Sequence, residues 1–204
     1  MFYELATLTL RFGTTPKAVE AVNNYVSESD AKGSLLGCWV ADIGDLNKLI
    51  VMRSFEREAD LNTERRRGLM SANPFGCSDL LVSFDMQSYM GFPWMSPAQP
   101  GSLGPIYEIR TYEFKLGGVQ PTIDAWQQAI PARTQLSPCV VAMIALDGAP
   151  RFINIWAYAS LADRSKARAD AIAQGIWPPK GGPDWLTTNM RSMIALPTAI
   201  SPLK

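Results

Sequence analysis

Histidine is absent from the 204 residues, and cysteine occurs only three times, at Cys38, Cys77 and Cys139. The lack of histidine excludes Ser-His-Asp triads, histidine-ligated haem and zinc sites that use histidine. No two cysteines stand in CxxC spacing, which disfavours a cysteine-only zinc site. Asp42 and Asp45 flank Gly44 in a predicted turn, and turn chemistry accounts for both carboxylates. We therefore expect no metal site and no cofactor.

Excess charge of one sign and long apolar runs are also missing. Lys and Arg together number 19, as do Asp and Glu, so the formal net charge is zero. A nucleic-acid partner needs a basic excess, and we expect none. No apolar run approaches the roughly 20 residues that span a bilayer, and the first residues alternate like a strand and do not resemble a secretion signal. Three widely spaced cysteines are typical of reduced thiols, which predicts a cytoplasmic protein.

The most informative feature present is an internal repeat. Residues 1–13 return as residues 105–117, with Tyr3 matched by Tyr107, 104 positions later. Residues 86–88 return at the same offset as residues 190–192. A period this long indicates a duplicated domain and not a solenoid repeat. We predict a first domain over residues 1–93, a linker rich in Pro, Gly and Ser over 94–104, and a second domain over 105–204.

Each half reads as strand, helix, strand, strand, helix, strand. The first half has predicted strands at 2–11, 35–43, 49–55 and 80–90, and helices from 16 and over 59–70. The second has strands at 106–114, 139–146, 152–158 and 190–196, and helices over 122–130 and 161–174. This order is the ferredoxin-like unit, whose antiparallel sheet has helices on one face and needs cover on the other. We predict the α+β class: two tandem ferredoxin-like repeats whose sheets pack into a closed α+β barrel with the helices outside.

Strand alternation selects the candidate ligand-binding residues. One face of the first strand carries Glu4, and the equivalent face of its repeat carries Glu108, Arg110 and Tyr112. We interpret this polar face as the lining of the barrel. With contributions from the second and third strands, the candidates are Glu4, Trp39, Arg53, Glu108, Arg110, Tyr112, Trp156 and Tyr158. They form either a binding cleft with charged anchors and aromatic walls or structural ion pairs between the sheets.

Several of these pieces resemble the NIPSNAP family. They include Tyr3-Glu4-Leu5, Tyr107-Glu108-Ile109-Arg110, Leu36-Gly37-Cys38-Trp39, Ile155-Trp156-Ala157-Tyr158 and the closing Leu196-Pro197. The resemblance covers nearly the whole chain as two domains. It implies a ferredoxin-like fold of the dimeric α+β barrel group and self-association, but no defined reaction. The two copies differ at equivalent positions: Ala6 corresponds to Arg110, and Arg53 corresponds to Trp156. Any site is therefore expected to be asymmetric.

Two functions remain open at this point. The first is a NIPSNAP-like homo-oligomer of undefined activity that binds a small molecule or another protein. The alternative is a cofactor-independent monooxygenase- or isomerase-like enzyme acting on a small metabolite inside the barrel. There Glu108 would be the base, Arg110 or Arg53 the anion clamp, and Tyr112 or Tyr158 the proton donor. The sequence leaves open whether the protein is an enzyme.

Assembly is predicted separately. A duplicated chain closes its barrel internally, and we expect free sheet edges and the linker residue Trp94 to remain available for contact with a second copy. We therefore predict a homodimer or larger homo-oligomer.

Overall fold

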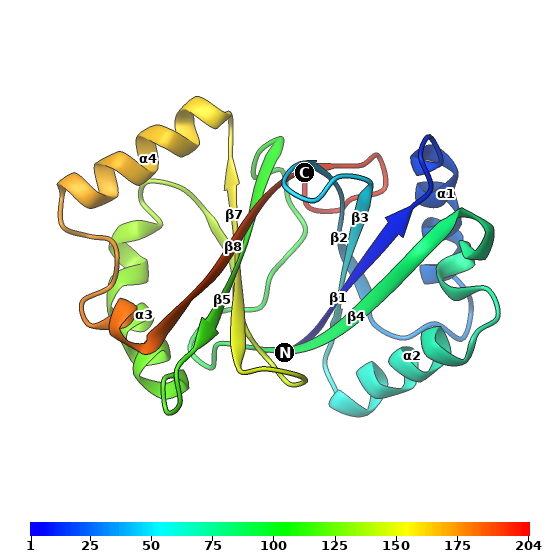
Figure 1. Ribbon diagram of the computed structural model, residues 1–204, viewed down its shortest axis with the longest axis horizontal. Coiled ribbons are helices and arrows are strands. Elements are labelled where there is room, and N and C mark those ends of the chain that lie inside the picture. The colour runs from blue at the N-terminus through cyan, green and yellow to red at the C-terminus, as the bar shows by residue number, and fades with distance from the viewer.

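The computed structural model describes all 204 residues and contains eight strands and four α-helices (Figure 1). The first half runs β1 (Phe2–Leu10), α1 (Thr15–Val26), β2 (Ser34–Ile43), β3 (Lys48–Phe55), α2 (Glu58–Met70) and β4 (Leu81–Gly91). The second runs β5 (Ile106–Phe114), α3 (Val119–Arg133), β6 (Cys139–Ala145), β7 (Arg151–Tyr158), α4 (Leu161–Ala173) and β8 (Leu186–Pro197). The same order of elements occurs twice, as predicted.

The eight strands form one closed antiparallel barrel in the order β1-β3-β2-β8-β5-β7-β6-β4. Two seams join the halves: β2 pairs with β8, with Val40 opposite Leu196, and β4 pairs with β6, with Met90 opposite Ile144. Figure 1 shows α1 and α2 outside one half-sheet and α3 and α4 outside the other. The predicted α+β fold of ferredoxin-like units, with helices outside a closed barrel, is confirmed.

The inside of the barrel is an apolar core. Tyr3 and Leu5 of β1 share one buried cluster with Tyr107 and Ile109 of β5. The opposite face of β1 packs on helices, where Leu8 contacts the cluster built around α1. Glu4 and Glu108 alternate with the core residues and therefore point towards the helices. The prediction that their face lines the barrel was wrong, because strand alternation shows which residues share a face but not which face is enclosed.

One end of the barrel is filled by large side chains and covered by the linker. Trp39 packs against Tyr107 with ring centroids 5.2 Å apart, and Ala98 of the linker donates its backbone N–H to the Tyr3 hydroxyl at 3.1 Å. Trp94 is half-buried and donates its indole N–H to the Ile123 carbonyl at 3.2 Å. Trp94 is thus held against α3 with part of its side chain exposed, and its contact with a second copy stays a prediction. Outside the two seams, residues 81–87 of β4 and 186–193 of β8 have a strand neighbour on one side only.

Element boundaries follow the sequence closely, with two differences in the second half. The structure starts α3 at Val119, before the predicted 122, because Pro121 lies in its first turn, where a missing N–H is tolerated, and it continues the helix through Pro131 to Arg133. It also starts β8 at Leu186, four residues before the predicted start. Gly175 ends α4 with φ of 64°, as expected of a helix-terminating glycine. No helix has both the length and the apolar character needed to cross a membrane.

The filled end of the barrel depends on a glycine. A Cβ added at Gly37 would lie 1.8 Å from Cη2 of Trp39, whose side chain is fully buried. We predict that Gly37→Ala lowers the free energy of unfolding by about 2 to 3 kcal/mol, because overpacking displaces the indole. Urea unfolding measures the change. Gly101→Ala is the matched control, since its nearest neighbour lies 4.0 Å away; equal losses in the two variants would contradict the packing account.

Candidate functional site

The predicted site residues do not gather in one place. Trp39 alone lies inside the barrel, in the packed core. The other seven lie on the helix side of the two half-sheets: Glu4 and Arg53 under α2, and Glu108, Arg110, Tyr112, Trp156 and Tyr158 under α3 and α4. The structure thus divides the predicted single lining into two separate polar clusters, one in each half.

The cluster of the first half is balanced and closed. The Arg53 guanidinium lies 2.7 Å from a Glu4 oxygen and 2.5 Å from a Glu64 oxygen, and all three side chains are buried. Burial raises the pKa of Glu64, but hydrogen bonds from Arg67 and from the Lys32 backbone outweigh burial, and the pKa is lowered overall. These groups hold α2 to the sheet. They are structural ion pairs, but they join one half-sheet to α2 and do not lie between the two sheets, as the sequence interpretation had it.

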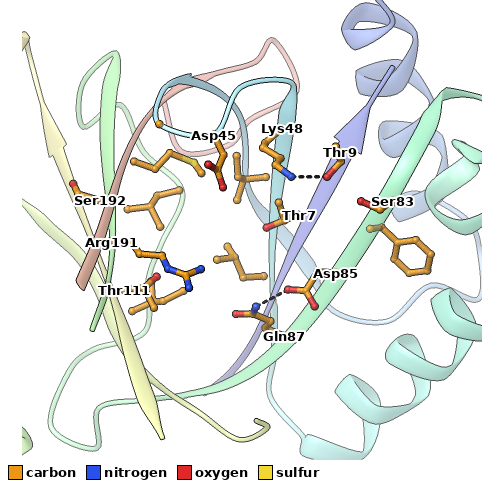
Figure 2. Close-up of a pocket in the computed structure, with 17 residues that line it drawn as sticks. Thr7, Thr9, Asp45, Lys48, Ser83, Asp85, Gln87, Thr111, Arg191 and Ser192 are labelled. Carbon is orange, nitrogen blue, oxygen red and sulfur yellow. Dashed lines mark hydrogen bonds between the residues drawn. The ribbon is translucent and has the colours of Figure 1, made fainter. Parts of the chain in front are cut away.

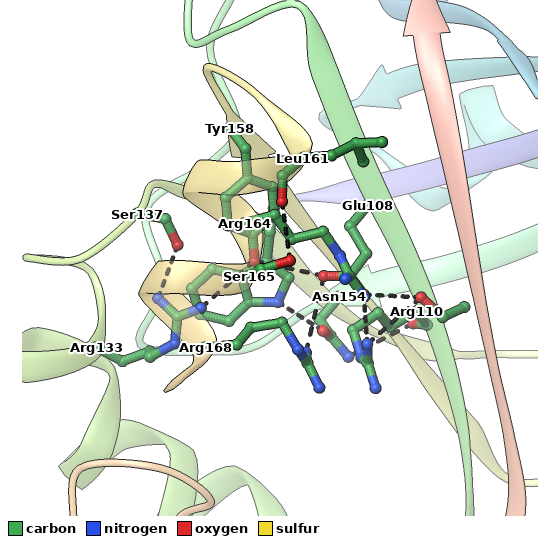
Figure 3. Close-up of polar contacts among 12 residues, drawn as sticks. Glu108, Arg110, Arg133, Ser137, Asn154, Tyr158, Leu161, Arg164, Ser165 and Arg168 are labelled. Atoms are coloured by element: carbon green, nitrogen blue, oxygen red, sulfur yellow. Dashed lines mark hydrogen bonds and ion pairs between the residues drawn. The ribbon is translucent and has the colours of Figure 1, made fainter. Parts of the chain in front are cut away.

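The cluster of the second half is centred on Glu108 (Figure 3). Arg164 of α4 contacts its carboxylate at 2.6 Å, Ser192 of β8 donates to it at 2.8 Å, and Arg110 of β5 forms a further ion pair. Burial raises the pKa of Glu108, but the hydrogen bond from Arg164, the charge of Arg110 and the hydrogen bond from Ser192 hold it at about 2. At neutral pH Glu108 is a carboxylate that binds protons too weakly to act as a general base.

The aromatic candidates pack beside this cluster. Tyr112 accepts a hydrogen bond from Arg110, and the Trp156 indole donates to the Asn154 side-chain oxygen at 2.7 Å. The Tyr158 hydroxyl lies 3.4 Å from Glu108. Arg133 of α3 lies over the Trp156 ring, 4.3 Å from its centroid. These rings therefore join α3 to the sheet and do not form walls of a barrel cleft.

The barrel does contain a cavity, of about 590 Å³, at the end opposite the packed aromatics (Figure 2). Its lining combines apolar side chains with threonines and charged groups from both halves. The lining residues include Leu5, Thr7, Thr9, Asp45, Lys48, Ile50, Asp85, Gln87, Ile109, Thr111, Ile153, Arg191 and Met193.

The strand register explains why the cavity is polar at its middle level. Thr7 lies opposite Asp85, and Thr111 lies opposite Arg191, so each half contributes a threonine and a charged residue. Two residues further along the same strands, towards the packed end of the barrel, Leu5 and Ile109 form the apolar floor of the cavity.

Two polar pairs near the cavity are satisfied, but Arg191 is not. Gln87 donates to Asp85 at 2.5 Å, and Lys48 donates to the Thr9 hydroxyl at 2.6 Å. Arg191 makes no side-chain hydrogen bond and no ion pair, and Figure 2 shows its guanidinium directed into the cavity. The cavity therefore holds an exposed arginine that forms no ion pair above an apolar floor, although the carboxylates of Asp45 and Asp85 also line it.

Sequence reasoning missed all of these lining residues. The available signal was polar residues on the strand face that also carries Leu5 and Ile109, where Thr7, Thr9 and Thr111 interrupt an apolar series. That signal was outweighed by the charges on the opposite face. No three acidic or cysteine side chains lie close enough together to hold a metal ion.

The profile of the NIPSNAP family matches residues 3–74 and 107–202, well over half of the chain. The chain belongs to the NIPSNAP family. No curated protein matches it in sequence.

Solved structures place this NIPSNAP chain among related folds. One is a putative monooxygenase from Lactobacillus acidophilus, 10% identical over 96% of this chain and 93% of that one, with a TM-score of 0.68. Another, from Fusobacterium nucleatum, also a putative monooxygenase, is 8% identical over 96% and 91%, with a TM-score of 0.63. A NIPSNAP family protein from Agrobacterium tumefaciens is 25% identical over 48% of this chain and 98% of its own, with a TM-score of 0.45. The first two likenesses show a shared fold.

The low pKa of Glu108 predicts a pH-dependent stability. Because the folded-state pKa of about 2 lies below the ordinary value of 4.5, its contribution is present above pH 4.5 and is lost as pH falls towards 2. We expect Glu108→Gln to lower the free energy of unfolding by about 2 to 3 kcal/mol at pH 7, discounted for the partly exposed arginines. The difference from wild type should shrink between pH 4.5 and 2.

Urea unfolding across that pH range measures both values. Glu20→Gln is the control, since Glu20 is exposed and forms no ion pair. A constant difference between wild type and Glu108→Gln down to pH 2 would contradict the assignment.

Proposed function

We propose that this NIPSNAP protein binds a small molecule in the open end of its barrel. The observation that carries the proposal is the unpaired Arg191 guanidinium directed into a cavity of about 590 Å³ with an apolar floor. A cavity of this size falls in the range used by small ligands, and an oriented cation inside it selects an anionic group.

The lining defines a chemical class for the ligand. Arg191 offers a planar donor fork that suits a carboxylate, and Thr111 beside it adds a hydroxyl. Leu5, Ile50 and Ile109 offer apolar contact below. A monocarboxylate with a short hydrocarbon or aromatic body satisfies both regions.

The repeat supports two domains, 1–93 and 105–204, that arose by tandem duplication and are joined by the linker 94–104. The repeated element order and the separate family matches in the two halves support this history. We also keep the cytoplasmic location as a prediction, because the three cysteines are free thiols that suit a reducing compartment.

The alternative, a cofactor-independent monooxygenase or isomerase, gains no residue-level support. The structural neighbours described as putative monooxygenases are at most 10% identical, and likeness at that level concerns the fold alone. The bases and acids nominated from the sequence lie outside the barrel, and the low pKa of Glu108 disfavours proton abstraction. Binding is the function that the cavity supports best.

Self-association is the second part of the proposal. Residues 186–193 of β8 have β5 as their only strand neighbour, and Met190 within them is 46% exposed. An unprotected strand edge with an exposed apolar side chain is a surface on which a second copy can pair. We propose a homodimer or larger assembly that uses this edge.

Carboxylate binding is tested by thermal shift with butyrate, hexanoate, octanoate and benzoate. At least one acid is expected to raise the Tm of the wild type, because ligand bound only to the folded state stabilises it. Arg191→Gln should bind that acid about tenfold more weakly, equivalent to about 1.4 kcal/mol. Arg66→Gln is the control, since Arg66 is exposed on α2 and remote from the cavity lining. Equal responses from wild type and Arg191→Gln would exclude the proposed site.

Assembly is tested by light scattering at micromolar concentration. The expected mass is at least twice the 22.4 kDa of one chain. Met190→Lys should return the mass to one chain, because a lysine on a strand edge opposes pairing. Met70→Lys, at an 81% exposed methionine of α2, should leave the assembly unchanged. A wild-type mass of one chain refutes self-association.

A further inference from the structure

Positive charge exceeds negative charge around Glu108. Three arginines share this one carboxylate: Arg164 at 2.6 Å, Arg168 at 3.8 Å and Arg110 in a third ion pair. None of the three forms an ion pair with any other acid. The group therefore carries two positive charges without counter-charges.

The excess is not a requirement of the fold, because the first half lacks it. Glu4 contacts a single arginine, Arg53, which is itself shared with Glu64. Ala6 of β1 corresponds to Arg110 of β5 when the two strands are aligned. Leu61 of α2 corresponds to Arg164 of α4 when the two helices, each of 13 residues, are aligned. Two of the three arginines thus occur where the equivalent helix–sheet junction uses small or apolar residues.

A fourth arginine, from α3, adds to the excess of positive charge around Glu108. Arg133 is 3% exposed and forms no ion pair with a carboxylate. Its guanidinium donates to the Ser137 hydroxyl at 2.7 Å and lies 3.4 Å from the Tyr158 hydroxyl, which in turn lies 3.4 Å from Glu108. A buried cation without a counter-ion raises the positive potential of the whole cluster.

The arginine cluster is open to solvent on one side and retains unused donors. The exposed fractions of the side chains rise from 14% for Arg110 to 25% for Arg164 and 37% for Arg168. Arg168, the most exposed of the three, forms no side-chain hydrogen bond, and the buried Nε of Arg164 has no acceptor. Figure 3 shows these arginines approaching Glu108 from β5 and α4. An anion arriving from solvent can therefore reach guanidinium groups that the protein itself does not saturate.

We propose that Arg110, Arg164 and Arg168 bind a dianionic phosphate group, either free or carried by a small molecule. Two surplus charges match a dianion, and guanidinium groups pair with phosphate oxygens through parallel hydrogen bonds. This site is independent of the barrel cavity. Arg110, Arg164 and Arg168 are not among the residues that line the cavity, whereas Thr111 and Arg191 lie opposite each other in its lining.

The test is calorimetric titration with inorganic phosphate, glycerol phosphate and acetate at constant ionic strength, set with chloride. Phosphate and glycerol phosphate are both expected to bind the wild type, because the arginines engage terminal oxygens that both possess. Acetate should bind at least tenfold more weakly. Arg168→Gln, which changes the most exposed member and so threatens folding least, should weaken phosphate binding about tenfold, whereas Arg66→Gln should bind as wild type.

Four results would overturn the proposal. They are no heat of binding with phosphate, unchanged affinity in Arg168→Gln, acetate binding as tightly as phosphate, or loss of phosphate binding in Arg191→Gln but not in Arg168→Gln. The last would place the anion in the barrel cavity, so the two sites are separated by the same titration. Binding of phosphate without glycerol phosphate would overturn the small-molecule part.

Discussion

Closure of the barrel at its two seams is the constraint on which the rest of the structure depends. Once β2 pairs with β8 and β4 with β6, every residue near the middle of a strand is assigned either to the enclosed core or to a helix layer. The seams are shorter than the strands they join. β2 ends at Ile43 and β6 ends at Ala145. Their neighbours β8 and β4 extend further, so residues 186–193 and 81–87 have no partner across the seams. The cavity lies where the seams end, so its position follows from strand lengths.

The sequence was sufficient for the fold because repeat, alternation and turn residues all pointed to the same order of elements. It was insufficient for the site because both faces of the strands are buried. Glu4 and Glu108 mark a polar face, yet the Glu64 that shares Arg53 with Glu4, and the Arg164 that pairs with Glu108, come from helices distant in sequence. Only the packing of α2 and α4 shows that these charges belong to the helix layer. Arg191 could not be placed either, since its exposure depends on where the seam with β2 ends.

The two halves share one arrangement of strands and helices but differ in the charged residues between sheet and helices. In the first, Glu4 and Glu64 are balanced by Arg53 and Arg67, and of these four groups only Arg67 is partly exposed to solvent. In the second, Trp156 replaces Arg53 in the strand register opposite Glu108, and arginines from β5 and α4 surround the carboxylate. This difference gives the NIPSNAP barrel an asymmetric outer surface around a nearly symmetric core.

The central claim is that one chain closes its own barrel, and cross-strand nuclear Overhauser effects measure this directly. Contacts are expected between Ala41 and Ala195 across one seam and between Met90 and Ile144 across the other. Isotope-filtered spectra of a mixture of labelled and unlabelled chains separate contacts within a molecule from contacts between molecules. The account predicts that both sets occur within one molecule. Their absence, or their appearance only between different molecules, would contradict it.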